Sequence, residues 1–125
     1  MNVLDAIKTR RAIKHFDPDH TMPDNDLDTL LEAGRLAPTA FNIQHTRFLV
    51  VKDKELREKI KALAWDQAQV TDASVLIVVC ADTNAWEKKP ERYWRNAPDQ
   101  VKDFMVGAIT GYYTNKEQVQ RDEAM

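Results

Sequence analysis

The sequence predicts an α+β fold, layered as a sheet flanked by helices. Two short apolar runs, Phe48–Val51 and Val75–Cys80, have the composition of strands. They alternate with segments whose apolar residues recur at helical spacing. The chain has 125 residues, of which 43% are hydrophobic and 30% are charged, and this suits one packed domain. The resulting order of helix, helix, strand, helix and strand is typical of an α/β-layered domain.

Two helices are expected before the first strand. Asn2 is a suitable N-cap for a helix from Val3 to about Thr9. A basic segment then interrupts the helical pattern, and Pro23 stands where a second helix can begin with acidic residues in its first turn. That helix is expected to end at Ala37, because the residue before a proline avoids the helical conformation.

A third helix is expected between the two strands. Asp53 is its candidate N-cap, and its buried side would carry Leu56, Ile60 and Leu63. The second apolar run has no polar interruption, so we expect a strand buried on both faces. Cys80, near the end of that strand, would then be an inert core residue.

The last third of the chain combines an irregular segment with further helices. Two tryptophans and a tyrosine lie among charges between residues 84 and 97. They can belong to a substrate lid, but covering the core is the more usual role of such side chains. Pro98 can open a helix that runs through Ile109. Another helical stretch begins near Asn115 and has no stop signal before Met125.

The predicted elements form only a thin core. Two or three strands with their helices are little for one stable domain. We therefore expect residues 1–125 to be a single, incomplete domain that is truncated at its C-terminus, or half of a larger obligate assembly.

Composition and charge exclude several classes of partner. The net charge of −2 provides no electrostatic case for nucleic acid or an anionic membrane. No apolar run approaches the roughly 20 residues of a membrane span, and an acid stands near the N-terminus where a signal peptide would be basic. The three histidines show no metal-ligand spacing. These features predict a cytoplasmic protein with no nucleic-acid, membrane or metal partner.

The segment Arg10-Arg11-Ala12-Ile13-Lys14 is the first candidate binding site. In an extended backbone Arg10, Ala12 and Lys14 point to the same side. Arg10 and Lys14 can then face one phosphate, for which the guanidinium provides a fork and the ammonium a point charge. From composition alone, a solvated basic turn is the more common outcome.

The loop Ala37–Gln44 is the second candidate. It offers two amide side chains, a hydroxyl and backbone N–H groups in a connection that Pro38 stiffens. Such a loop can contact the edge of a heterocycle. The alternative is an ordinary helix-to-strand connection whose amides satisfy the local backbone.

These two segments and a third, in this order, resemble the FMN-dependent nitroreductase family. The matching blocks are Arg10-Arg11-Ala12-x-Lys14-x-Phe16, Ala37-Pro38-Thr39-Ala40-x-Asn42-x-Gln44 and Gln69-Val70-x-Asp72-Ala73. Two differences stand out: Ala12 replaces a common serine, and Thr39-Ala40 replaces a serine pair.

The resemblance implies an intertwined homodimer with two FMN sites at its interface, each shared between the subunits. The positions that would hold the FMN phosphate and ribityl chain from one subunit are Arg10, Arg11, Ala12 and Lys14. The loop that would pack on the flavin from the other subunit supplies Pro38, Thr39, Ala40 and Asn42. Gln69 falls near a position that contacts the edge of the isoalloxazine ring.

The resemblance also implies an activity. An FMN-dependent NAD(P)H oxidoreductase takes hydride from the nicotinamide and passes it, in a ping-pong mechanism, to a small oxidant such as a nitroaromatic or a quinone. The flavin provides the redox chemistry, so we assign no catalytic side chain. Members of the family continue well beyond this length. The alternative is therefore a non-catalytic, truncated flavin-binding or dimerisation module.

Overall fold

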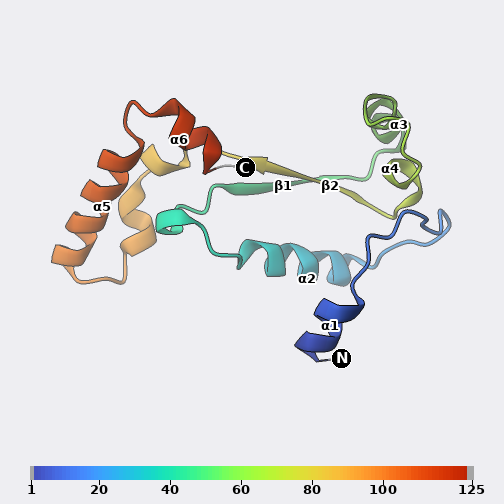
Figure 1. Cartoon of the computed structure of the whole chain (residues 1–125), viewed down its shortest axis with the longest axis horizontal. Coiled ribbons are helices and arrows are strands. Elements are labelled where there is room, and N and C mark those ends of the chain that lie inside the picture. The colour runs from blue at the N-terminus through green and yellow to red at the C-terminus, as the bar shows by residue number, and fades with distance from the viewer. Residues whose placement is uncertain (1, 124–125) are drawn as a thin grey trace. The chain divides into compact units, whose positions relative to one another are not determined.

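The computed structural model describes residues 2–123 and contains helices and a two-stranded sheet (Figure 1). The elements in chain order are α1 (Val3–Thr9), α2 (Asp24–Arg35), η1 (Ala40–Asn42), β1 (Thr46–Val51), α3 (Lys54–Leu63), α4 (Gln69–Asp72), β2 (Leu76–Ala81), η2 (Ala85–Glu87), η3 (Pro90–Trp94), α5 (Asp99–Tyr113) and α6 (Glu117–Asp122). The order predicted for the first two strands and their helices is confirmed, with the short helix α4 added before β2.

The chain divides into two compact units by its internal contacts. The first unit contains the residues up to Met22 together with Val50–Ile77. The second contains Pro23–Leu49 together with the residues from Val78 onward. The single domain expected over residues 1–125 stays a prediction. No helix among residues 2–123 is long and apolar enough to cross a membrane.

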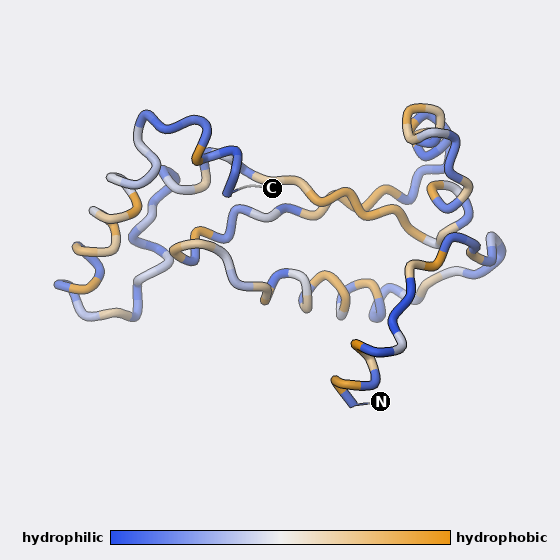
Figure 2. The backbone as a smooth tube through the Cα atoms, viewed as in Figure 1, coloured by the Kyte–Doolittle hydropathy of each residue, from blue (hydrophilic) through white to orange (hydrophobic). Residues whose placement is uncertain are grey.

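The two strands are antiparallel. The N–H of Asp82, just after β2, donates to the carbonyl of His45, just before β1, at 2.9 Å. Figure 2 shows that β2 is hydrophobic along its length, yet Val79 is 66% exposed and Cys80 is also exposed. The prediction of a strand buried on both faces, with Cys80 in the core, is therefore wrong. A sheet of two strands leaves an edge of each strand unpaired, and the described residues do not cover both of its faces.

The first unit is organised around a buried arginine. Arg57 in α3 is only 4% exposed. Its Nε donates to the carbonyl of Val70 at 2.8 Å, and its Nη atoms donate to the carbonyls of Ala73 and Ser74. The last carbonyls of a helix lack partners within the helix. One guanidinium therefore satisfies the end of α4 and the chain that leads to β2.

This arginine also corrects the predicted burial of α3. Asp53 does cap the helix, accepting from the N–H of Leu56 at 2.7 Å. However, Leu56 and Leu63 of the expected core face are exposed. Apolar spacing located the helix correctly but not its buried side, because the backbone carbonyls of the neighbouring α4 require a donor.

The second unit contains an aromatic cluster. Ile43, Ile109 and Tyr113 are buried together. The partly buried residues packed against them are Phe41, Trp86, Tyr93, Trp94 and Val119. The prediction that the aromatic residues of segment 84–97 cover the core is confirmed. In Figure 1, η2, η3 and α6 lie beside α5, which supplies two of the three buried residues.

The C-terminal helix is shorter than expected. We expected a helix that runs through Met125 without a stop, but α6 ends at Asp122, and Glu123 is its C-cap. Residues 124 and 125 lie outside the described part of the chain.

A close approach of α2 to β1 requires a glycine in the second unit. A Cβ at Gly34 would lie 2.7 Å from Cζ of Phe48. That distance is well inside van der Waals contact, so the phenyl ring occupies the space of a side chain. The contact positions the end of α2, from which the loop Ala37–Gln44 departs.

We predict that Arg57→Met lowers the free energy of unfolding by about 2–4 kcal/mol, because it leaves buried carbonyls without donors. The measurement is urea denaturation followed by circular dichroism. Lys59→Met, on the exposed side of the same helix, is the matched control and should change stability by less than about 0.5 kcal/mol. Equal stability of the two variants would contradict the role of Arg57.

Candidate functional site

The loop between α2 and β1 has an unusual backbone. Phe41, Asn42 and Gln44 have φ values of 50°, 57° and 48°, in the left-handed region. Asparagine tolerates this region, whereas an aromatic residue adopts it rarely. Each such residue costs on the order of 1–3 kcal/mol and persists only where its surroundings impose it. The sequence predicted a loop here but not its conformation.

The aromatic cluster supplies those surroundings. The ring of Phe41 lies 5.3 Å from that of Tyr112 and 6.1 Å from that of Tyr113, measured between centroids. Ile43, two residues later, is 4% exposed and is buried in the same cluster. The ring of Tyr113 in turn stacks on Trp86 at 6.0 Å. Two apolar side chains of the loop are thus held in the core of the second unit.

Hydrogen bonds complete the shape of the loop. The hydroxyl oxygen of Thr39 accepts from the N–H of Gln44 at 3.0 Å. The N–H of Asn42 donates to the carbonyl of Thr39, and that of Ile43 donates to the carbonyl of Ala40. The side-chain amide of Gln44 donates to Oδ1 of Asn42 at 3.2 Å. The two amide side chains are exposed, so the loop offers polar groups outward while its apolar residues face inward.

Tyr113 is a structural residue in this arrangement. Its side chain is 1% exposed, and its hydroxyl has no hydrogen-bond partner among the described residues. Burial, followed by the nearby Glu123 carboxylate and Tyr112, raises the pKa of Tyr113 to about 12. Tyr113 therefore stays protonated at neutral pH, and we assign it no role in proton transfer.

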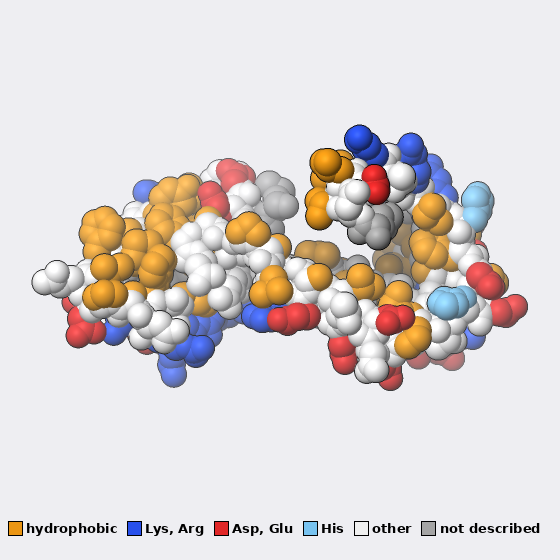
Figure 3. Space-filling view, turned by 90° about the horizontal axis from the view of Figure 1, so that it is seen from below, with side chains coloured by type: hydrophobic (Ala, Val, Ile, Leu, Met, Phe, Trp, Pro, Cys, Tyr) orange, Lys and Arg blue, Asp and Glu red, His pale blue; other side chains and the backbone are white. Residues whose placement is uncertain are grey.

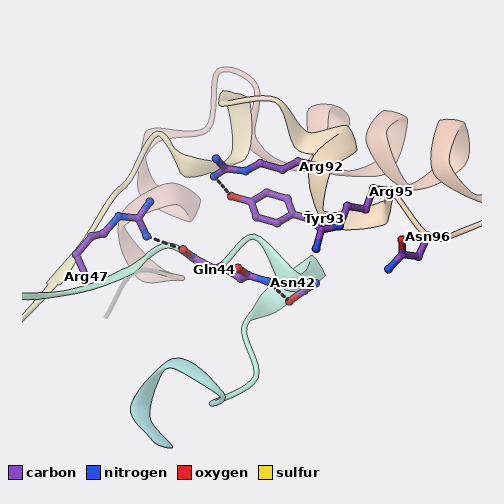
Figure 4. Close-up of a pocket in the computed structure, with 7 residues that line it drawn as sticks. All are labelled: Asn42, Gln44, Arg47, Arg92, Tyr93, Arg95 and Asn96. Carbon is purple, nitrogen blue, oxygen red and sulfur yellow. Dashed lines mark hydrogen bonds between the residues drawn. The ribbon is translucent and has the colours of Figure 1, made fainter. Parts of the chain in front are cut away.

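An open pocket of about 470 Å³ lies beside the loop and is called the arginine pocket below (Figure 4). Its lining residues are Asn42, Gln44, Arg47, Arg92, Tyr93, Arg95 and Asn96. All seven belong to the second unit, and none is acidic. In Figure 4 the side chains come from the loop, from β1 and from η3 and the residues just after it.

One carboxylate lies at the margin of the arginine pocket. Arg47 forms an ion pair of 3.3 Å with Asp82, which also pairs with Lys88 at 2.8 Å. The hydrogen bond from Lys88, with help from the N–H of Asn84 and the charge of Arg47, lowers the pKa of Asp82. Asp82 is therefore ionised at neutral pH and is shared between two cations.

A second pocket, of about 480 Å³, lies between α2 and β1 in the same unit. Its lining includes Leu31, Thr39 and Phe48, and it shares Gln44 and Arg47 with the arginine pocket. The loop thus borders two hollows of different character. One is cationic, and the other contains apolar surface next to the hydroxyl-bearing Thr39.

The basic segment lies in the first unit. Arg10, Arg11, Ala12 and Lys14 are all exposed. The guanidinium of Arg11 donates to the carbonyls of Lys8 and Arg10 at 3.0 and 2.8 Å, which leaves it turned back on its own chain. Neither Arg10 nor Lys14 forms an ion pair within residues 2–123. Both charges are therefore available to a ligand.

The predicted site residues divide between the two units. Arg10, Arg11, Ala12, Lys14 and Gln69 belong to the first unit, and Gln69 is the first residue of α4. The residues of the second unit are Pro38, Thr39, Ala40 and Asn42. The roles assigned to all nine stay predictions.

Sequence reasoning missed the arginine pocket. Arg47 stands 45 positions before Arg92, so no local pattern joins them. One signal was present: Arg92 and Arg95 are three residues apart, which places them on one side of a helical turn. No group of three or more metal-ligating side chains occurs within residues 2–123.

Comparison with known proteins shows similarity along most of the chain. A family model described as "Nitroreductase family" matches residues 7–123. "Protein DrgA" of Synechocystis sp. is 54% identical over 124 residues, which are 99% of this chain and 59% of that protein. "Putative NAD(P)H nitroreductase YfkO" of Bacillus subtilis is 32% identical over 97% of this chain and 55% of its own length.

Solved structures share the fold. A crystal structure described as a "putative nitroreductase in complex with FMN" from Exiguobacterium sibiricum matches with a TM-score of 0.84 at 28% identity, over 99% of this chain and 62% of that one. The "putative nitroreductase ydfN" of Bacillus subtilis matches with a TM-score of 0.86 at 32% identity, over 97% of this chain and 61% of that one. These likenesses confirm the predicted α+β fold. The chain spans about 55–62% of the length of these relatives.

Proposed function

The chain belongs to the nitroreductase family, and from this premise we propose that it forms part of an FMN-dependent NAD(P)H oxidoreductase. The observation that carries the proposal is the pairing of a strained amide-bearing loop with an exposed basic segment at the positions where the family resemblance requires them. Relatives named as NAD(P)H nitroreductases and a structural neighbour in complex with FMN support it.

The residues present fit the chemical groups of FMN. Arg10 and Lys14 have no partner among the described ion pairs, and together they can neutralise most of a phosphate dianion. The loop offers the exposed amides of Asn42 and Gln44, which can both donate and accept at the edge of a heterocycle. No carboxylate lines the arginine pocket, whereas Asp28 and Glu32 line the second pocket, where Glu32 pairs with Arg35 at 2.7 Å.

Each group of residues would have one task. Arg10, Arg11 and Lys14, with the backbone at Ala12, would bind the phosphate and ribityl end. Pro38, Thr39, Ala40 and Asn42 would pack on the ring system, and Gln69 would contact its edge. FMN, when bound, supplies the hydride chemistry. The side chains bind and orient it, and the oxidant would be a small molecule such as a nitroaromatic or a quinone.

A second candidate function keeps the same residues but not the turnover. This second candidate is a flavin-binding or dimerisation module; the chain spans 59% of Protein DrgA and 55% of YfkO. Steady oxidation of NADPH by the FMN-loaded chain in the presence of a quinone would support the enzyme. FMN binding without such oxidation would support the module. The cytoplasmic location stays a prediction.

We further propose that the chain functions as a homodimer with shared flavin sites. Val3, Leu4 and Ile7 of α1 are 65–75% exposed, and Phe104 of α5 is 72% exposed. Figure 3 shows hydrophobic side chains, in orange, exposed on the visible face. Apolar surface of this extent is typical of a surface that a partner covers.

We predict that Arg10→Ala weakens FMN binding by about 10- to 150-fold, which corresponds to about 1.5–3 kcal/mol for a charge-assisted hydrogen bond. Equilibrium dialysis with fluorescence detection measures the affinity. Lys59→Ala, an exposed cation elsewhere in the first unit, is the control and should bind FMN as the wild type does. Riboflavin lacks the phosphate, so its affinity should be the same in all three proteins. An equal loss of riboflavin affinity in Arg10→Ala would contradict a phosphate role.

We predict that the chain sediments at about 29 kDa, twice its mass of 14.4 kDa, at micromolar concentration. Ile7→Asp places a charge on the exposed apolar side of α1, where no residue is buried, and should shift the equilibrium toward the monomer while circular dichroism stays unchanged. Asp5→Asn, on the same helix, is the control. It also changes the charge of α1 by one unit but adds no charge to the apolar side, so it should leave the equilibrium between monomer and dimer unchanged. A monomeric wild type would refute the dimer.

A further inference from the structure

The arginine pocket holds more positive charge than the neighbouring carboxylates neutralise. Arg47 shares Asp82 with Lys88. Arg92 and Arg95 form no ion pair with any described residue. Glu87 and Glu91 belong to η2 and η3, yet neither lines the pocket. The pocket is therefore a place of unneutralised positive charge on a chain whose net charge is −2.

Two of the three arginines are held in place. One Nη atom of Arg47 donates to the carbonyls of Gln44 and Thr46 at 2.7 and 2.9 Å. The guanidinium of Arg92 donates to the hydroxyl of Tyr93 and lies 4.5 Å from the centre of its ring. Figure 4 shows both guanidinium groups beside the same open space. Side chains fixed in this way lose little further freedom when a ligand binds.

The remaining lining groups are also suited to an anion. The amides of Asn42, Gln44 and Asn96 supply N–H donors, and Arg95 adds a guanidinium that has no hydrogen-bond or ion-pair partner among the described residues. A ligand with one carboxylate has only two oxygens, which pair with one guanidinium group. Three guanidinium groups with several amides match a group that has many oxygens, and phosphate geometry suits arginine in particular.

We propose that the arginine pocket binds the phosphate or diphosphate group of a small organic molecule. Its volume of about 470 Å³ lies in the range of small-molecule sites. Asn42 and Gln44 belong both to this pocket and to the loop assigned to the flavin ring, so the ligand would bind beside that ring. Binding of the phosphate needs only the contacts within the second unit, whereas its position beside the flavin ring rests on the proposed function. It concerns a phosphate other than that of FMN.

The test is binding of inorganic pyrophosphate, measured by isothermal titration calorimetry on the full chain. Arg92→Gln and Arg95→Gln should each weaken binding by about tenfold, and the double variant by more, because each removes a charge-assisted contact. Arg121→Gln is the matched control, since it removes the same charge from an exposed position of α6 in the same unit. Circular dichroism should show all variants folded, because the three side chains are exposed.

Two further arms identify the source of the phosphate. If NADP⁺ binds more tightly than pyrophosphate and loses affinity in the same variants, the pocket takes the phosphates of the nicotinamide co-substrate. If NADP⁺ binds no more tightly, the ligand is another phosphorylated metabolite. Either result supports the phosphate chemistry.

Three results would overturn the proposal. The first is undetectable pyrophosphate binding, or binding that is equal in Arg92→Gln, Arg95→Gln and Arg121→Gln. The second is a loss of pyrophosphate binding in Arg10→Ala, which would place the anion at the basic segment. The third is a loss of FMN but not riboflavin affinity in the Arg92 and Arg95 variants, which would make the pocket part of the flavin site. Failure of FMN binding alone would refute the proposed function and leave this inference intact.

Discussion

The packing of Phe41 against Tyr112 and Tyr113 holds the loop on which both pockets depend. Three left-handed residues in four positions are costly, and the side-chain hydrogen bonds within the loop are exposed, so most of that cost must be offset elsewhere. Burial of the Phe41 ring and of Ile43 in the aromatic cluster does so. Because the apolar residues face inward, Asn42 and Gln44 face the solvent, and the carbonyl of Gln44 then receives the Arg47 guanidinium.

In the first unit a buried side chain also stabilises the backbone of a connecting segment. There the end of α4 and the approach to β2 leave carbonyls that need donors, and Arg57 supplies them from α3. The hydroxyl of Ser74 donates to the carbonyl of His20, which links the approach to β2 with the segment that follows the basic residues. These backbone carbonyls thus have donors within the first unit, while the charges of Arg10 and Lys14 stay exposed and available to a ligand.

The local chemistry of the chain predicted much of the fold. Asn2 and Asp53 cap their helices with side-chain oxygens, and Pro98 precedes α5, as expected from residues that act on their immediate neighbours. Burial was harder to predict, because it depends on what else covers a surface. Cys80 and Leu63 are apolar and were expected inside, yet the described chain has too few elements to enclose them.

The candidate site likewise has a part that the sequence predicted and a part that it did not. The family blocks identified the basic segment and the loop, because their residues are close together in sequence. The left-handed backbone at Phe41 was not predictable, since it depends on tyrosines some 70 positions later. The arginine pocket was not predictable for the same reason. Arg47 and Arg92 line one pocket only once β1 and η3 are placed within the second unit.

The most direct test of this account is amide hydrogen exchange at Gln44, whose N–H donates to the Thr39 hydroxyl only when the loop has its strained shape. In the wild type the amide should be protected. In Phe41→Ala it should exchange at least about tenfold faster, because about 1.4 kcal/mol or more of anchoring is lost. The amide of Leu56, capped by Asp53 in the first unit, should not change. Unaltered protection of Gln44 in Phe41→Ala would contradict the claim that aromatic packing holds the loop.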